Sequence, residues 1–268
     1  MRYSFSTVAL LLAAAGVAEA QPKPTVDPDA LYELDAPAQK PPVASSPLGK
    51  LLETMYLRAC VRSDVAPFGV FGGNGLEGYD IDLASEIAQQ ISIDYKQALR
   101  VEWTVVSAED RIKRVQDGSC DILVADLSLT KERAAQIATS KVYLRTDKVL
   151  VAVAKITHKT PVIARLASAT GDAGNLAGTT RVFQSYREII HAMNAGEIDY
   201  VVTDKPIAEH LIRSATRPYA IGKTLAANAE SYVVGVNAAS PDVLAAVDRA
   251  LQDLAQNGRL ALLDRRWL

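Results

Sequence analysis

Cysteine and histidine are scarce in this 268-residue chain, and neither sign of charge is in excess. Two cysteines exclude a disulfide-dense scaffold and an all-cysteine zinc site, and the three histidines, His158, His191 and His210, lack the spacing of metal ligands. No metal or other cofactor is therefore expected. With 29 Lys and Arg against 31 Asp and Glu, the net charge of −2 provides no overall field for nucleic acid, so a charged ligand must be recognised by a local cluster of residues.

The N-terminus has the order of features found in a secretory signal peptide. Arg2 is followed by an apolar run over residues 8–17 and then by Ala18-Glu19-Ala20, a small-x-small cleavage pattern that a buried N-terminal helix would not explain. A helix needs about twenty apolar residues to span a bilayer, and this apolar run has half that length. We therefore predict that residues 1–20 are a cleaved signal peptide and that the mature chain, from near Gln21, is a soluble periplasmic protein.

Residues 21–47 contain seven of the twelve prolines of the chain and little hydrophobic periodicity. Such a composition favours an extended backbone without a packed core. We predict that residues 21–47 form a tether and that the folded unit begins near Leu48.

The remaining sequence alternates between strand and helix patterns. With 49% hydrophobic residues, the chain has enough apolar surface for one large or two ordinary domains. The alternation predicts an α/β fold, with a mostly parallel sheet covered by helices. The predicted strands are residues 57–61, 101–106 and 122–125, and the predicted helices are residues 81–91, 108–117 and 242–268.

Two segments, residues 107–126 and 185–204, repeat one pattern. Each opens with a serine and a carboxylate three residues later, continues as a helix to a glycine, and ends as an apolar strand at an aspartate, Asp126 or Asp204. Two copies predict two similar lobes. Because ligands of open α/β sheets lie beyond the carboxyl ends of strands, we expect the two aspartates on opposite walls of one cleft. Chance similarity remains an alternative, since six of twenty positions are identical.

The segment ADLSLTKER has the features of an anion site. Thr130 is a predicted helix N-cap, which places Arg133 in the first turn, where the helix dipole disfavours a cation by about 0.3 to 1 kcal/mol. An arginine at this position is explained if it binds a carboxylate together with the hydroxyl groups of Ser128 and Thr130. A surface arginine paired with Glu132 or Glu109 is the alternative.

Five segments in order resemble the periplasmic solute-binding proteins of polar amino acid ABC importers, called solute-binding family 3. The resemblance implies a periplasmic binding protein type 2-like fold, with two α/β lobes joined by hinge strands and a ligand cleft between them. It also implies a monomer that closes on an amino acid and delivers it to an ABC permease in the inner membrane. The segments are residues 57–71, 76–88, 125–133, 196–204 and 244–267.

The predicted division of the chain follows from this resemblance. Lobe 1 is expected to comprise residues 48–150 and 237–268, and lobe 2 residues 151–236 with the hinge segments near residues 149–153 and 219–236. Lobe 2 is shorter than is usual in the family, and no strand-helix pattern could be placed between Lys155 and Arg181.

Four residues match ligand-binding positions of the family. The resemblance implies that Arg133 binds the α-carboxylate of the ligand, with the Ser128 hydroxyl beside it, and that Asp204 accepts the α-ammonium. Thr170 is matched to a lobe 2 threonine that binds the carboxylate, although the glycine that usually precedes this threonine is absent.

Resemblance to the glutamate/aspartate-binding branch of the family suggests the ligand side chain. In that branch one arginine precedes a Pro-Phe pair, as Arg62 precedes Pro67 and Phe68, and another begins a helix, as Arg111 does. Arg62, Phe68 and Arg111 are therefore expected at the site, with two guanidinium groups for a side-chain carboxylate. An Arg62 paired with Asp64 and a solvated Arg111 are equally open.

Asp126 argues against an acidic ligand, since that branch usually has a small residue at this position. A carboxylate would repel an acidic side chain unless it pairs with the ligand ammonium or with Arg62, and a structural role in the turn before Ser128 is also open. Three arginines and two aspartates give the predicted cleft a net charge of +1, which favours an acidic amino acid.

Cys60 and Cys120 are expected on adjacent strands but at different heights. Their Cα atoms are expected beyond the separation of about 7 Å that a disulfide permits, so we favour two buried free thiols over a disulfide.

The leading interpretation is a binding protein without catalytic activity. One alternative is a periplasmic enzyme on the same fold that resembles cyclohexadienyl dehydratases. Those enzymes have a glutamate three residues after the aspartate that matches Asp204, where this chain has Ile207. The other alternative is a ligand sensor.

Overall fold

A computed structural model of the chain describes residues 38–156, 158–170, 176–225 and 230–268. The predicted signal peptide and most of the predicted tether lie outside these residues. Within them, no helix combines the length and the apolar character needed to cross a membrane.

The described end of the predicted tether is attached to the first lobe. The amide of Gln39 donates to the carbonyl of Asp94 at 2.7 Å. Ser46 then caps helix α1 (Pro47–Thr54) by accepting a hydrogen bond from the amide of Gly49. Among the described residues, contact with lobe 1 therefore starts before the predicted beginning of the folded unit at Leu48.

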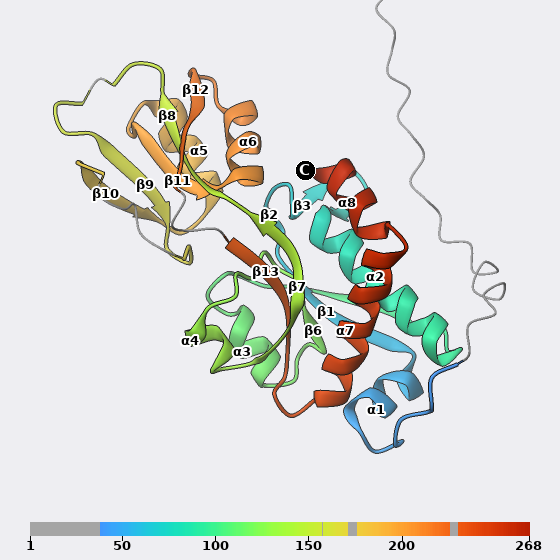
Figure 1. Ribbon diagram of the computed structural model, residues 1–268. Coiled ribbons are helices and arrows are strands. Elements are labelled where there is room, and N and C mark those ends of the chain that lie inside the picture. The colour runs from blue at the N-terminus through green and yellow to red at the C-terminus, as the bar shows by residue number, and fades with distance from the viewer. Residues whose placement is uncertain (1–37, 157, 171–175, 226–229) are drawn as a thin grey trace, which may run out of the picture. The chain divides into compact units, whose positions relative to one another are not determined.

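Lobe 1 is built on a sheet with the strand order β5-β1-β6-β13-β7 (Figure 1). β1 pairs in parallel with β5 and β6, whereas β13 is antiparallel to β6 and β7. These strands are β1 (Tyr56–Val61), β5 (Arg100–Val105), β6 (Ile122–Leu123), β7 (Ala138–Thr146) and β13 (Glu230–Val236). A smaller antiparallel sheet consists of β2 (Asp64–Val65), β3 (Gly69–Gly72) and β4 (Gly75–Glu77).

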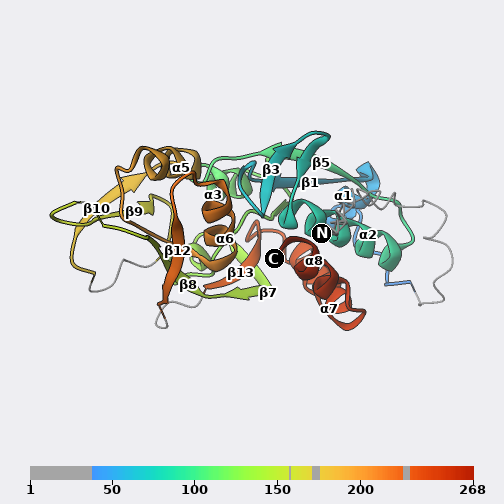
Figure 2. The ribbon, with the colours of Figure 1, turned by 90° about the horizontal axis from the view of Figure 1, so that it is seen from above.

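Three long helices of lobe 1, α2, α7 and α8, pack against one another (Figures 1 and 2). Gly78 precedes α2 with φ +137°, and a Cβ there would lie 2.2 Å from the carbonyl oxygen of Phe68, so only glycine fits. The remaining helices of this lobe are α1 and two short ones. The bounds are α2 (Tyr79–Tyr95), α3 (Arg111–Gln116), α4 (Lys131–Ala134), α7 (Pro241–Gln256) and α8 (Arg259–Trp267).

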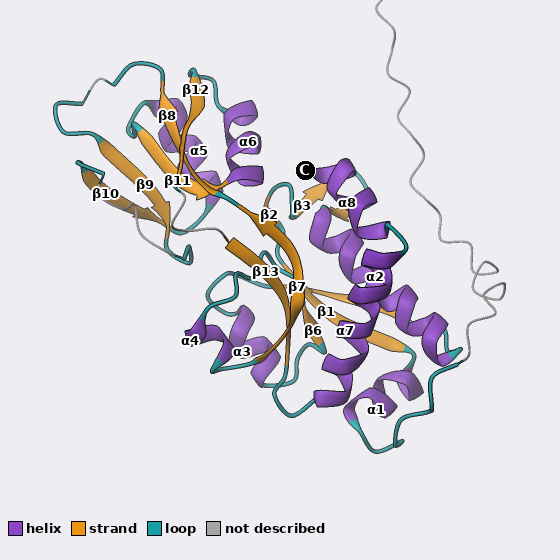
Figure 3. Cartoon of the chain, in the orientation of Figure 1, coloured by secondary structure: helices purple, strands orange, loops and turns teal. Residues whose placement is uncertain are grey.

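Lobe 2 is built on a second sheet with the order β10-β9-β11-β8-β12. Helix α5 packs on β9 and β10, and α6 packs on β8, β11 and β12 (Figure 3). The elements are β8 (Lys148–Val153), β9 (Val162–Leu166), β10 (Thr179–Phe183), β11 (Tyr200–Asp204), β12 (Tyr219–Thr224), α5 (Tyr186–Ala195) and α6 (Lys205–Ser214). The predicted α/β fold with two lobes is confirmed, and β9 fills part of the segment in which no strand could be placed.

The chain passes between the lobes earlier than the predicted boundaries. β7 belongs to the sheet of lobe 1 and β8 to that of lobe 2, so the first crossing is at Asp147 and residues 149–153 lie inside lobe 2. β13 pairs with β6 and β7, which assigns Glu230–Val236 to lobe 1 rather than to lobe 2. The boundary depends on which strands each residue pairs with, and strand pairing is not given by the sequence pattern.

The two predicted repeats differ more than their sequences suggested. In the second, Ser185 caps α5, which ends at Gly196 with φ +73°, and β11 runs directly to Asp204. In the first, the Ser107 hydroxyl accepts from the amide of Asp110 in a turn, and α3 has only 6 residues, against 10 in α5. The first helix is therefore shorter than the one predicted at residues 108–117 and shorter than its counterpart in the second segment.

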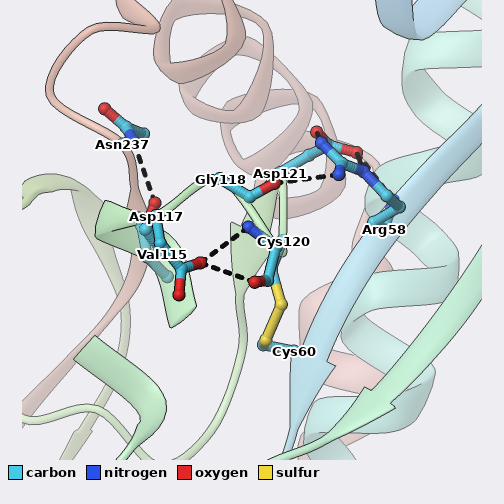
Figure 4. The surroundings of a disulfide bond; sticks show 9 residues. Arg58, Cys60, Val115, Asp117, Gly118, Cys120, Asp121 and Asn237 are labelled. Atoms are coloured by element: carbon cyan, nitrogen blue, oxygen red, sulfur yellow. Dashed lines mark hydrogen bonds and ion pairs between the residues drawn. A yellow bond between two sulfur atoms is a disulfide. The ribbon is translucent and has the colours of Figure 1, made fainter. Parts of the chain in front are cut away.

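Cys60 and Cys120 form a disulfide with a Cα–Cα distance of 5.7 Å (Figure 4). The preference for free thiols is wrong because β6 begins only at Ile122, opposite Ala59, which leaves Cys120 in the preceding turn and within reach of β1. Arg58 fixes the same turn: its guanidinium donates to the carbonyl of Gly118 and pairs with Asp121 at 2.6 Å.

Candidate ligand-binding site

The predicted site residues converge where lobe 1 meets lobe 2. Side chains of both lobes line a cavity of about 20 Å³, which is about the space needed for one water molecule. A ligand larger than a water molecule therefore fits only if the lobes separate. Its charged and hydroxyl-bearing lining residues include Arg111, Asp126, Ser128 and Arg133 of lobe 1, and Lys148, Thr170 and Asp204 of lobe 2.

Arg133 is a largely buried cation that has no carboxylate partner among the described residues. Thr130 caps α4 as predicted, since its hydroxyl accepts from the amide of Arg133 at 3.2 Å. The guanidinium donates to the carbonyls of Ser128 at 2.8 Å and of Ser168, in lobe 2, at 3.1 Å. Burial, together with the neighbouring charge of Arg111, lowers the pKa of Arg133 to about 10. An anion bound here would supply the missing negative charge.

Arg62, by contrast, is fully engaged by carboxylates. Its side chain is 1% exposed and forms a two-pronged contact with Asp64, with Nε to Oδ1 and Nη2 to Oδ2 both at 2.9 Å. Nη1 lies 3.3 Å from Oδ2 of Asp126. Burial opposes the charge of Arg62, but Asp126 and Asp64 outweigh it and raise the pKa of the guanidinium. The pairing with Asp64, left open by the sequence, is present.

Asp126 holds Arg111 as well as Arg62. Nη1 of Arg111 lies 3.0 Å from Oδ1 of Asp126 and also donates to the carbonyl of Ala125, and the Arg111 side chain is buried rather than solvated. Asp126 has φ +44°, a left-handed conformation that non-glycine residues adopt rarely. Its amide donates to Asp80 at 2.6 Å, which fixes the turn that carries the carboxylate.

On the other side of the cavity, Lys148 joins two carboxylates. Its Nζ lies 3.1 Å from Oδ1 of Asp204 and 3.0 Å from Oε1 of Glu230. Asp204 accepts a further hydrogen bond from the Tyr232 hydroxyl at 2.5 Å, and Glu230 accepts one from the Thr170 hydroxyl. Tyr232 and Glu230 belong to β13 of lobe 1, so these contacts connect the lobes.

The pKa values of the two carboxyls shift in opposite directions. Burial raises the pKa of Asp204, against the opposing effect of Lys148. For Glu230 burial acts in the same upward direction, but hydrogen bonds from Thr170 and Ser128 and the charge of Lys148 together lower its pKa.

The charged groups of the site balance once their ion-pair partners are included. The charged residues that line the cavity, Arg111, Asp126, Arg133, Lys148 and Asp204, sum to +1. Their partners Arg62, Asp64 and Glu230 add one positive and two negative charges, which brings the sum to zero. The expected net charge of +1 had counted Arg62 in the cleft and had omitted Lys148, Glu230 and Asp64.

Phe68 lies outside the cavity. It is fully buried, with its ring 5.2 Å from that of Tyr232 and 6.0 Å from that of Tyr79, both in edge-on arrangements. Phe68 thereby supports the strand that carries Tyr232, and it does not line the cavity.

Comparison with known proteins agrees with this architecture. A family model described as bacterial extracellular solute-binding proteins, family 3, matches residues 57–268. The chain belongs to this family. A similar protein is the ABC transporter glutamine-binding protein GlnH of Bacillus subtilis (strain 168), 25% identical over 221 residues, which cover 78% of this chain and 79% of GlnH.

Solved structures share the fold of this family 3 protein. A mutant of ArgBP from T. maritima superposes with a TM-score of 0.70 at 22% identity, covering 81% of this chain and 97% of that one. The ancestral amino acid-binding protein AncCDT-1, a precursor of cyclohexadienyl dehydratase, gives a TM-score of 0.71 at 21% identity, covering 83% and 99%.

Two charged residues of this solute-binding protein's site were missed in the sequence. Lys148 opens the apolar strand KVLVAV and Glu230 opens ESYVVGV. A charged residue at the first position of an apolar strand was the available signal, because such a residue is usually buried only when it is paired. Of the predicted residues, Arg111, Asp126, Ser128, Arg133, Thr170 and Asp204 line the cavity, whereas Arg62 and Phe68 do not.

Proposed function

We propose that this chain is an exported binding protein for a zwitterionic amino acid with a neutral polar side chain, which it delivers to an ABC permease. Export by removal of residues 1–20 and action as a monomer are parts of the proposal. Arg133, Ser128, Thr170 and Asp204 are the proposed ligand contacts, and closure of the two lobes is the proposed response to ligand.

The observation that carries the proposal is the uneven distribution of charge in the site. The charges sum to zero, but one group of residues has a positive charge in excess and another group has a negative charge in excess. Arg62, Arg111 and Arg133 face two carboxylates, Asp64 and Asp126, so this side has one positive charge in excess. Asp204 and Glu230 form ion pairs only with Lys148 among the described residues, so one negative charge is in excess around this lysine. A ligand with one carboxylate and one ammonium complements both sides.

An acidic ligand was favoured by the sequence because Arg62 and Arg111 were expected to bind its second carboxylate. Arg62 is paired with Asp64, and Arg111 is paired with Asp126. A second ligand carboxylate would therefore have to displace a buried ion pair. A neutral amide side chain needs no such displacement. The name of the B. subtilis relative, a glutamine-binding protein, supports this choice.

An enzymatic role has less support than binding. The position at which the dehydratases have a glutamate holds Ile207, which is 1% exposed on α6. The named B. subtilis relative is a binding protein. A ligand sensor would use the same binding site. A transport protein and a sensor differ in the partner that recognises the closed form, which is a permease for transport and a receptor for sensing.

Calorimetric titration of the purified protein with glutamine, asparagine, glutamate, aspartate and arginine tests the proposal. We expect an amide amino acid to bind at least about tenfold more tightly than the acidic or basic ones, a difference of about 1.4 kcal/mol. Tightest binding of glutamate or aspartate would support the acidic alternative, and the absence of binding to any amino acid would refute an amino acid-binding function.

Arg133→Met is the matching site variant. Loss of a buried charged partner costs about 2 kcal/mol or more, so binding is expected to weaken at least about 30-fold. The control is Arg114→Met, which removes an exposed arginine of α3 in the same lobe and should leave affinity unchanged. Equal affinities of the Arg133→Met variant and the wild type would show that Arg133 does not hold the carboxylate.

A further inference from the structure

Lys148 is held rigidly at the cavity wall. It is the first residue of β8 and is paired in register with Asp204 on β11. The amide of Lys205 donates to the carbonyl of Asp147 at 2.9 Å, and that of Leu225 to the carbonyl of Lys148 at 2.8 Å, so the backbone on both sides of the residue is fixed. The side chain is 2% exposed, and its ammonium lies between Asp204 and Glu230.

The position of this ammonium determines how much positive charge a ligand can add. Asp204 and Glu230 together carry two negative charges, and Lys148 neutralises one of them. One ligand ammonium completes the balance. A second cationic group that reached Asp204 or Glu230 would also approach the Lys148 ammonium in a buried site, where repulsion between like charges is stronger than in water.

We propose that Lys148 is a specificity-determining residue, a built-in ammonium that occupies half of a two-carboxylate site and excludes amino acids with cationic side chains. This inference rests on the proposed function, because it assumes that the ligand ammonium binds at Asp204 and Glu230. A lysine with a purely structural role would hold the two strands together without affecting which ligand is chosen.

Lys148→Met separates these roles. The substitution retains a long apolar side chain but leaves two unpaired carboxylates, which a ligand with two positive charges would neutralise. We expect the affinity for arginine relative to glutamine, measured by calorimetry, to rise at least about tenfold in this variant. Lys223→Met, at an exposed lysine on β12 of the same lobe, is the matched control and should leave the ratio unchanged.

Glu230→Gln provides a second test, which avoids the two unpaired carboxylates that Lys148→Met leaves. Alone it leaves Asp204 balanced by Lys148, so glutamine should bind at least about tenfold more weakly. Adding Lys148→Met to Glu230→Gln restores one negative charge in excess, and glutamine binding should recover. Thermal unfolding of each variant without ligand establishes that it is folded.

The outcomes distinguish this inference from the proposed function. If the wild type binds no amino acid, both are overturned. If the wild type binds glutamine but Lys148→Met weakens glutamine and arginine equally, or if the double variant binds no better than Glu230→Gln, Lys148 is structural and only this inference is overturned.

Discussion

Asp80, at the start of α2, is a buried carboxyl directly behind the site. It accepts hydrogen bonds from the Tyr143 hydroxyl at 2.9 Å and from the amide of Asp126 at 2.6 Å. Burial and the charge of Asp126 raise the pKa of Asp80 to about 7, although the two hydrogen bonds and Arg111 act in the opposite direction. The folded protein therefore retains a proton that an unfolded aspartic acid, with a pKa of about 3.9, would release.

This difference predicts how stability depends on pH. The contribution of the Asp80 proton is complete below about pH 4 and is lost as the pH rises to about 7, at up to about 1.4 kcal/mol per pH unit. Urea unfolding between pH 5 and 8 should show this decline in the wild type and a shallower one in Asp80→Asn. Asp110→Asn, at an exposed carboxylate, should follow the wild-type curve. Parallel curves for Asp80→Asn and the wild type would contradict the assignment.

At the scale of single residues, the sequence predicted which residues lie at the site better than it predicted which of them form ion pairs. Arg133 could be recognised because a cation in a first helical turn is unfavourable without an anion. The partners of Arg62 were among the alternatives, but those of Arg111 and Asp204 were not, because an ion pair between residues as distant as Lys148 and Asp204 depends on strand register in three dimensions. The expected charge count therefore included Arg62, which does not line the cavity, and omitted Lys148, which does.

At the scale of elements, the disulfide fixes the turn between α3 and β6. Cys60 is fully buried on β1, Cys120 is 1% exposed, and they are 60 residues apart in sequence. A cross-link closing a loop of this length stabilises a folded domain by about 2 to 4 kcal/mol.

Replacing both cysteines by alanine is therefore expected to lower the free energy of unfolding by about 2 to 4 kcal/mol. The ligand profile should not change, because neither cysteine lines the cavity. Urea unfolding with and without dithiothreitol provides the measurement: reductant should destabilise the wild type and have no effect on the double-alanine variant. An unchanged wild-type midpoint in reductant would show that the cross-link contributes nothing.

Long periodic elements could be predicted, and short ones could not. The helix expected at residues 81–91 is the core of α2, and the strand at residues 57–61 is almost all of β1. β6 has two residues and α3 has six, too few for hydrophobic periodicity to define their ends. Cys120 lies in the turn before β6, and hydrophobic periodicity does not give the path of a turn, so the expectation for Cys120 was wrong.

At the scale of the molecule, the two lobes are held together by hydrogen bonds across the cavity. The Arg133 guanidinium reaches the carbonyl of Ser168, and the Tyr232 hydroxyl of lobe 1 reaches Asp204 of lobe 2. These bonds involve the same groups that are proposed to bind ligand. Ligand entry and lobe separation are therefore coupled, because a ligand at Arg133 and Asp204 must replace contacts that the lobes make with each other.

Tyr232→Phe tests this coupling. It removes one bond between the lobes, a loss of about 0.5 to 1.5 kcal/mol, and should shift the ligand-free protein about two- to tenfold toward separated lobes. Small-angle scattering should then give a larger ligand-free radius of gyration than for the wild type, and ligand should reduce it. Tyr219→Phe is the control, because the Tyr219 hydroxyl donates to the carbonyl of Ile198 within lobe 2 at 2.7 Å. Equal radii for the ligand-free Tyr232→Phe and Tyr219→Phe variants would show that the Tyr232 bond does not restrain the lobes.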